Sequence, residues 1–160
     1  MRVTLHTAYL ILALALSPTL FAFLQVLGVK PNLFLIYLVI AGFYVSKTES
    51  IWLGLVFGFA FDLIVGMKIG LNAVLYMFAC FFVTLLCENM IRRSNAVVVF
   101  VCTVLWTVVF EGIAAVLSSA NGMLYILKVL GIEAVYNGVL ALVVYAVLSR
   151  LFVRLYDEKG

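Results

Sequence analysis

The fold of this chain is decided by the stretch LFLIYLVIAGFYVS at residues 33–46, the polar turn KTES at 47–50, and IWLGLVFGFAFDLIVG at 51–66. Both longer segments are continuously apolar and lack the alternation of polar and apolar residues that marks the strands of a membrane β-barrel. Only α-helices and closed barrels satisfy their backbone hydrogen bonds in lipid. The stretch therefore predicts two membrane helices joined by a short turn.

The composition extends this prediction to the whole chain. Of its 160 residues, 68% are hydrophobic and 11% are charged, whereas soluble domains are about 45–50% apolar and about 25% charged. A chain of this length cannot bury such an excess in one core, so the remainder must face lipid. This excludes a soluble enzyme and a secreted domain. The net charge of +3 is too small and too scattered for a nucleic-acid partner.

Apolar runs and the polar residues between them predict a single transmembrane domain over residues 1–160, an all-α integral membrane bundle of six helices. Each helix needs about 20 residues to cross, so six leave about 40 for connections and tails. The expected spans are residues 8–27, 33–46, 51–66, 73–91, 96–117 and 132–148. Residues 124–130 are too short to span and contain Lys128, which predicts an interfacial or re-entrant piece.

The basic residues predict the orientation of this bundle. Six spans place both termini on one side, and that side collects seven of the ten Lys and Arg residues, namely Arg2, Lys47, Arg92, Arg93, Arg150, Arg154 and Lys159. The opposite side collects Lys30, Lys68 and Lys128. Because cytoplasmic loops carry the excess of basic residues, both termini are expected in the cytoplasm.

Neither the cysteines nor the histidine indicates a metal or another cofactor. Cys80, Cys87 and Cys102 lie inside apolar runs without a Cys-x-x-Cys pair, which is typical of buried free thiols. His6 is the single histidine and lies at the edge of the first apolar run. We expect it to be an interfacial residue without partners.

Asp62, Glu88 and Glu111 lie within predicted spans, where a charge is costly and therefore marks a candidate site. Glu88 precedes Arg92 by four residues near the cytoplasmic end of its span. An i,i+4 ion pair that reaches the interface accounts for Glu88. Asp62 and Glu111 are not accounted for in this way and remain candidates.

Asp62 and Glu111 are expected to share their depth with two uncharged polar residues, Asn137 and Tyr76. Counting 1.5 Å per residue from the outer ends of four spans places them all roughly 6–9 Å below the outer boundary. This outer polar cluster is either a satisfied network that ties helices together or a site open to a ligand or to another protein's helix. Catalysis is not expected, because no nucleophile, base and orienting group can be assembled.

Small residues recur every four positions along residues 51–66 and into the turn that follows. This glycine strip comprises Gly54, Gly58, Asp62, Gly66 and Gly70. Small side chains at i and i+4 let another helix approach closely. That helix belongs either to this chain or to a partner.

These residues occur in an order that resembles the MreD family, small membrane proteins of the bacterial rod-shape system. The resemblance covers nearly the whole chain and is carried by Pro31, Asn32, Leu33, Glu49, Gly54, Gly58, Phe59, Asp62, Gly66, Gly70, Leu71, Asn72, Tyr76, Tyr136 and Asn137. Glu111 and residues 124–130 match no signature of the family.

The resemblance implies a non-enzymatic scaffold of the bacterial cytoplasmic (inner) membrane that helps maintain rod shape during lateral peptidoglycan synthesis. It implies MreC as the direct partner, which we expect to pack on the glycine strip and the outer polar cluster. MreB, RodA and its penicillin-binding transpeptidase form the wider complex. The family is also similar in fold to the S components of energy-coupling factor transporters, so the alternative is a small-molecule (vitamin-type) binding subunit. A lipid-intermediate binder is a third possibility, for which the sequence shows no basic pocket.

Overall fold

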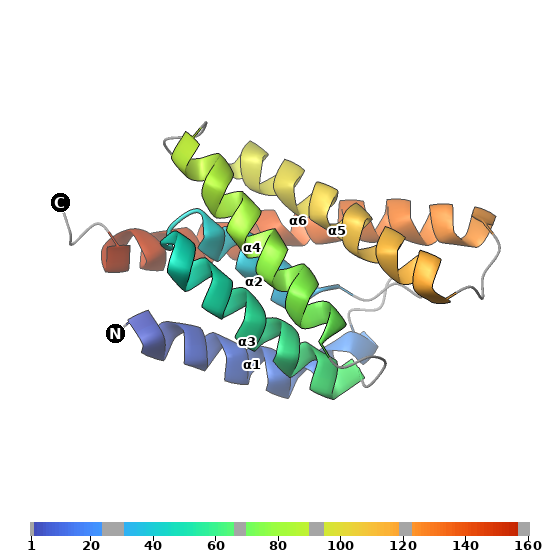
Figure 1. The fold of residues 1–160 in the computed structure, drawn as a ribbon, viewed down its shortest axis with the longest axis horizontal. Coiled ribbons are helices and arrows are strands. Elements are labelled where there is room, and N and C mark those ends of the chain that lie inside the picture. The colour runs from blue at the N-terminus through green and yellow to red at the C-terminus, as the bar shows by residue number, and fades with distance from the viewer. Residues whose placement is uncertain (1, 24–30, 66–69, 90–94, 119–122, 157–160) are drawn as a thin grey trace.

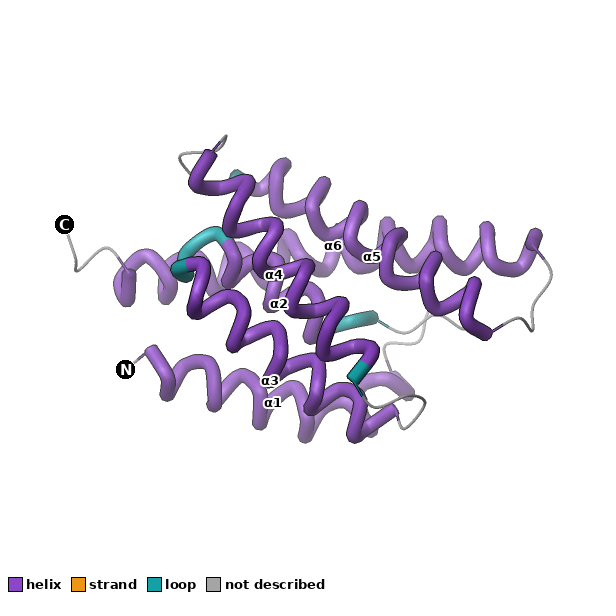
Figure 2. Tube along the Cα trace, in the orientation of Figure 1, coloured by secondary structure: helices purple, strands orange, loops and turns teal. Residues whose placement is uncertain are grey.

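The computed structural model describes residues 2–23, 31–65, 70–89, 95–118 and 123–156. These residues form six α-helices and no strand, so the predicted all-helical class is confirmed. The helices are α1 Arg2–Phe23, α2 Leu33–Gly42, α3 Lys47–Val65, α4 Leu71–Asn89, α5 Ala96–Ser118 and α6 Met123–Tyr156. Figure 2 shows that helices make up almost all of the described trace.

Two hairpins, α3–α4 and α5–α6, pack on the short helix α2 (Figure 1). α2 contacts each of the other five helices, whereas the two hairpins have little direct contact with each other. The N- and C-termini lie at the same end of the bundle, which we call the terminal end. The opposite end, where α2 and α4 begin, is the far end. α2 therefore organises the core.

The sequence of α2 is compatible with its central position. Its ten residues are apolar on every side, and all residues from Phe34 to Gly42 are buried. A helix without a polar face can lie within a protein or face lipid, and here the other five helices cover it. Ten residues extend about 15 Å, half of the roughly 30 Å hydrocarbon core of a bilayer. The helix is therefore shorter than the span predicted at residues 33–46.

In the described part of the chain, three helical segments are long and apolar enough to cross a membrane by themselves, namely Leu71–Glu88, Ala96–Ile113 and Gly131–Arg154. Thr4–Leu14 and Leu33–Gly42 are shorter apolar segments. Length and composition thus support three of the six predicted spans, and the other three stay predictions.

Apolar side chains cover the outside of the bundle, and polar side chains lie within it. The exposed apolar residues recur every four positions on α4, at Val74, Phe78, Phe82 and Leu86, and on α6, at Val135, Val139, Val143 and Val147. The buried polar residues include Asp62, Thr84, Thr103, Thr107 and Asn137. This inverted arrangement is typical of a protein surrounded by lipid.

The glycine strip of α3 packs against α4 of the same chain. A Cβ added to Gly54 would overlap the backbone of Met77, and one added to Gly58 would overlap the backbone of Ala73. The two helices therefore meet backbone to backbone, as small residues allow. The expectation that a partner's helix packs along this strip is wrong, because α4 occupies it. Gly66 lies outside the described residues.

The last helix is longer than predicted. α6 runs without a break from Met123 to Tyr156, so residues 124–130 are its first turns and not a separate piece. Their interfacial position stays a prediction. Gly131 does not interrupt the helix, and a Cβ at this position would meet nothing within 4 Å. Thirty-four residues extend about 51 Å, more than the hydrocarbon core, so the turns that contain Lys128 can extend past it.

Candidate functional site

Two groups of buried polar side chains lie at the two ends of α2. The first surrounds Asn32, the N-cap residue of α2, at the far end. We call it the Asn32 network, and its members are Asn32, Tyr76, Thr107 and Asn137, each at most 7% exposed. It joins the start of α2 to α4, α5 and α6.

Asn32 is the centre of this network because its amide and its backbone bond in three directions. Its Oδ1 accepts hydrogen bonds from Leu35 N at 3.0 Å and from Tyr76 Oη at 2.8 Å. Its backbone N donates to Asn137 Oδ1 at 3.0 Å. Asn137 Nδ2 in turn donates to Thr107 Oγ1 at 3.3 Å. Asparagine suits both positions, since it caps helices well and offers a donor and an acceptor.

Asp62 makes a separate set of contacts with the start of α4. Its carboxylate is 1% exposed. Oδ2 accepts from Gly70 N at 2.7 Å and Ala73 N at 3.3 Å, and Oδ1 accepts from Asn72 Nδ2 at 2.6 Å and Asn72 N at 3.3 Å. Free N–H groups and the helix dipole make a helix N-terminus favourable for a carboxylate. Gly70 has φ +99°, a conformation that suits glycine, and it directs the chain into α4.

Glu111 of α5 lies beside Glu133 of α6. The pair lies one turn beyond the contact between Thr107 and Asn137, which joins the same two helices. Glu133 is 8% exposed. The pair therefore marks a second polar contact between α5 and α6.

The four residues of the predicted outer polar cluster fall into three separate contacts. Tyr76 and Asn137 are joined through Asn32. Asp62 holds the start of α4, and Glu111 pairs with a glutamate that the sequence analysis did not single out. The common depth of these residues thus brings two of them into one network and leaves the other two with partners of their own.

Residues that carried the family resemblance build much of the far end. Asn32, Gly70 and Asn72 take part in the contacts above. Pro31 is buried directly before the cap of α2, and Tyr136 is half-buried on α6. Much of the motif therefore connects α2 and α3 to the helices around them.

The polar groups of the bundle bond to one another. Among the described residues, every buried side-chain nitrogen or oxygen has a hydrogen-bond partner. No three His, Cys, Asp or Glu side chains in this part of the chain come together in a way that could hold a metal ion. Cys80 and Cys102 are buried free thiols, as predicted.

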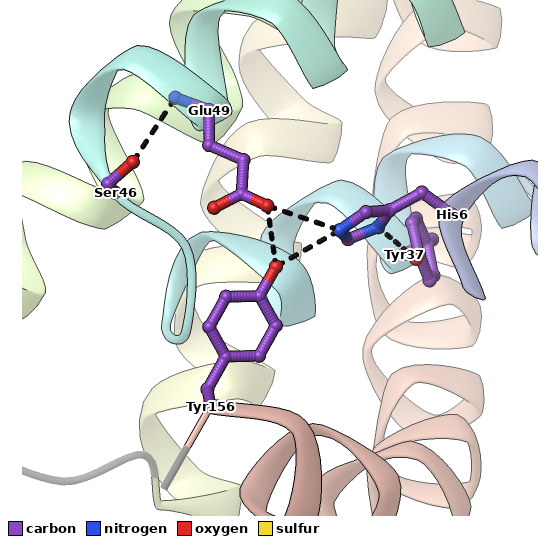
Figure 3. Close-up of polar contacts among 5 residues, drawn as sticks. All are labelled: His6, Tyr37, Ser46, Glu49 and Tyr156. Atoms are coloured by element: carbon purple, nitrogen blue, oxygen red, sulfur yellow. Dashed lines mark hydrogen bonds and ion pairs between the residues drawn. The ribbon is translucent and has the colours of Figure 1, made fainter. Parts of the chain in front are cut away.

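The second group of polar side chains lies at the terminal end, and we call it the His6 network (Figure 3). His6 of α1 is 7% exposed, and it meets Tyr37 of α2, Glu49 of α3 and Tyr156 of α6. Nδ1 lies 2.6 Å from Tyr37 Oη, and Nε2 lies 3.1 Å from Tyr156 Oη and 3.6 Å from Glu49 Oε1. Tyr156 Oη donates to Glu49 Oε1 at 2.7 Å. One imidazole thus ties four helices together.

Aromatic rings surround this imidazole. Tyr37 stacks between Tyr9 and Phe57, with ring centroids 3.9 Å and 5.1 Å away. The ring of Phe152 lies 6.2 Å from that of His6. Removal from water lowers the pKa of His6 below its ordinary value, and the nearby Glu49 carboxylate opposes this effect. His6 precedes the first predicted span.

Sequence reasoning missed the His6 network, and its expectation that His6 has no partners is wrong. Tyr37 and Tyr156 lie 31 and 150 residues away along the chain. No local spacing reveals contacts of this kind, because tertiary packing creates them. Glu49 was the available signal, since it lies in a polar turn and belongs to the family motif.

Glu88 forms its ion pair with Lys47, which is not the basic residue that the sequence predicted. Its Oε2 lies 2.6 Å from Lys47 Nζ, so the pair links the end of α4 to the start of α3. The predicted partner, Arg92, lies outside the described residues. Both side chains are about half exposed, and such pairs contribute little to stability.

Together these features define a helical membrane protein whose buried polar residues bond to one another within the chain. A model of the rod shape-determining protein MreD matches residues 1–156, and the chain belongs to the MreD family. The predicted resemblance is therefore confirmed, and membership implies a role in determining rod shape. Comparisons with curated proteins and with solved structures found no match.

Proposed function

We propose that this protein is a non-enzymatic scaffold of the cell-wall elongation complex in the bacterial inner membrane. It crosses the membrane six times with both termini in the cytoplasm, and it binds MreC directly. MreB, RodA and its penicillin-binding transpeptidase belong to the wider complex. The observation that carries the proposal, beside the family, is that each described buried polar side chain is bonded within the protein. Such a satisfied network stiffens a bundle, as a scaffold requires.

A vitamin-binding role of the S-component type is less well supported by the polar residues. A ligand pocket needs a few polar groups that converge on the ligand and are free to bind it. Asn32, Tyr76 and Asn137 already bond to one another, and Asp62 already binds the start of α4. The scaffold is therefore the function that these contacts favour.

The outer face of α6 is the surface that we propose for the membrane span of MreC, because α4 already covers the glycine strip. Exposed valines recur along this face at Val135, Val139, Val143 and Val147. A hollow of about 470 Å³ lies near its start and is lined by Gly131, Ile132, Val135, Tyr136 and Val139. β-Branched side chains have little rotamer freedom to lose, and a glycine admits a close neighbour.

Co-purification from a mild detergent tests both the partner and the surface. We expect MreC to co-elute with the wild-type chain and to be reduced at least about tenfold by Val139→Trp, which fills the hollow and disturbs helix packing. Val74→Trp on α4 is the matched control, since Val74 and Val139 are 46% and 51% exposed. Failure of MreC to co-elute with the wild type would contradict direct binding. Equal retention by the two tryptophan variants would contradict only the α6 surface.

A further inference from the structure

We propose that His6 is a proton-controlled latch, which holds the N-terminal helix α1 to the bundle when the imidazole is neutral and loosens α1 when the imidazole gains a proton. The latch lies at the terminal end, apart from the α6 face assigned to a partner. It therefore stands or falls independently of the scaffold function.

The direction of each hydrogen bond determines where the protons of this network lie. Tyr156 donates its hydroxyl proton to Glu49, so its oxygen accepts from His6, and Nε2 of His6 must carry the hydrogen. In a neutral ring Nδ1 then has a free lone pair, which accepts from the hydroxyl of Tyr37 at 2.6 Å. In this tautomer both ring nitrogens of His6 and the hydroxyl groups of Tyr37 and Tyr156 have hydrogen-bond partners.

A second proton on His6 breaks this arrangement at Tyr37. Nδ1 then becomes a donor and competes with the Tyr37 hydroxyl, which loses its acceptor. Tyr37 is 0% exposed, and its hydroxyl has no other hydrogen-bond partner among the described residues. A buried donor without an acceptor is costly, and so is a charge in a buried ring. Protonation therefore weakens the link between α1 and α2.

The Glu49 carboxylate favours the protonated form of His6, but its effect is limited. The carboxylate of Glu49 lies 3.6 Å from Nε2, but its side chain is 29% exposed, so water screens the attraction. Among the described residues, the titratable groups that contact His6 are Tyr37 of α2, Glu49 of α3 and Tyr156 of α6. Tyr9 of α1 stacks on Tyr37. Burial of His6 outweighs Glu49 and lowers the pKa of the imidazole.

α1 is the helix that such a change would move, because within the described part of the chain it packs least on its neighbours. It packs only lightly on α2 and α3, whereas the two hairpins pack extensively. Its polar links to α2 include the contact of His6 with Tyr37 and the hydrogen bond from Tyr9 Oη to Leu33 O at 3.3 Å. Tyr9 also stacks on Tyr37. Loss of the Tyr37 contact thus disturbs both attachments.

The chain offers a direct measurement, since His6 is its only histidine. The imidazole nitrogens of the full-length protein, labelled with ¹⁵N-histidine and purified without a histidine tag, report both tautomer and titration. We expect the neutral Nε2–H tautomer near neutral pH and a titration midpoint below 6.5. Glu49→Gln should lower this midpoint by about half to one pH unit. Glu88→Gln is the control, since Glu88 pairs with Lys47 at the same end of the bundle and should leave the midpoint unchanged.

Hydrogen exchange then tests whether the proton moves α1. After correction for intrinsic rates, we expect exchange in residues 4–14 to rise about tenfold at a pH below the measured midpoint, while α3 and α4 keep their protection. Tyr37→Phe should shrink this acid response, because no hydroxyl loses its acceptor. A titration midpoint at or above 6.5 would overturn the latch. Hydrogen exchange in α1 that does not change when His6 gains a proton would also overturn it.

Discussion

At the far end of α2, Asn32 is bonded to Tyr76 and Asn137 through amide and hydroxyl groups, whereas at the terminal end Tyr37 is bonded to the imidazole of His6. Both networks are buried, and both join α2 to neighbouring helices. An amide keeps its donor and its acceptor at every physiological pH, but an imidazole changes an acceptor into a donor when it gains a proton.

The hydrogen bonds at the two ends of α2 therefore differ in their dependence on pH. The Asn32 network and the cap that Asp62 places on α4 keep the far end in one arrangement. The His6 network holds the terminal end in an arrangement that depends on one proton. The difference shows that a central helix can be held firmly at one end and conditionally at the other.

The sharpest way to break the far end is to remove the carboxylate of Asp62. Asp62→Ala leaves the N–H groups of Gly70, Asn72 and Ala73 without their acceptor, and we expect the free energy of unfolding to fall by about 3 kcal/mol. Unfolding in mixed detergent micelles, followed by circular dichroism, measures this change. Asp62→Asn keeps an acceptor and should cost less. Equal stability of Asp62→Ala and wild type would contradict the role of the cap.

A smaller effect is expected when the amide that links α2 to α6 is lost. Asn137→Ala leaves the backbone N–H of Asn32 unpaired, which costs about 2 kcal/mol in the same assay. The comparison of the two ends predicts that the loss is the same at neutral and at mildly acidic pH. Asn95→Ala, which removes only an exposed hydrogen bond from Val97 N at the start of α5, is the control and should cost less. If the loss of stability differed between these two pH values, the Asn32 network would depend on pH, contrary to this comparison.

The smallest effect concerns His6 and should depend on pH. Because its pKa is lowered by folding, the stabilisation from the neutral ring is complete above 6.5 and is lost as the pH falls through the lowered pKa. The difference in free energy of unfolding between the wild type and His6→Gln, which does not titrate, should narrow in that range by about 1 kcal/mol or less. A difference that widens below 6.5 would mean that protonation strengthens the network.

The sequence predicted more of the polar residues at the far end than at the terminal end. Asp62 and Asn137 were found because polar residues in apolar spans are conspicuous, and Tyr76 because it lies at their depth. Glu111 was found in the same way, but its neighbour Glu133 was not, since Glu133 lies at the start of a predicted span. His6 was wrongly predicted to be an interfacial residue without partners. Its position at the edge of an apolar run is typical of such a residue, and no neighbour in the sequence indicates the distant side chains that it contacts.

The glycine strip and α2 show that the sequence also predicts helix packing only in part. Glycines four residues apart predict that a helix lies close, but only the fold shows that α4 is that helix. A run of apolar residues predicts a buried helix, but the end of α2 at Gly42 follows from the turn back into α3.

The sequence by itself determined that this protein is an all-helical membrane protein, because composition and apolar runs constrain what can face lipid, and the order of its motif residues gave the resemblance to the MreD family. Only the tertiary structure decided which helix lies at the centre, which one covers the glycine strip, and that the lone histidine is the hub of a buried network. Burial and hydrogen bonding join residues that are distant in the chain, so the partners of a polar side chain become defined only when the helices pack.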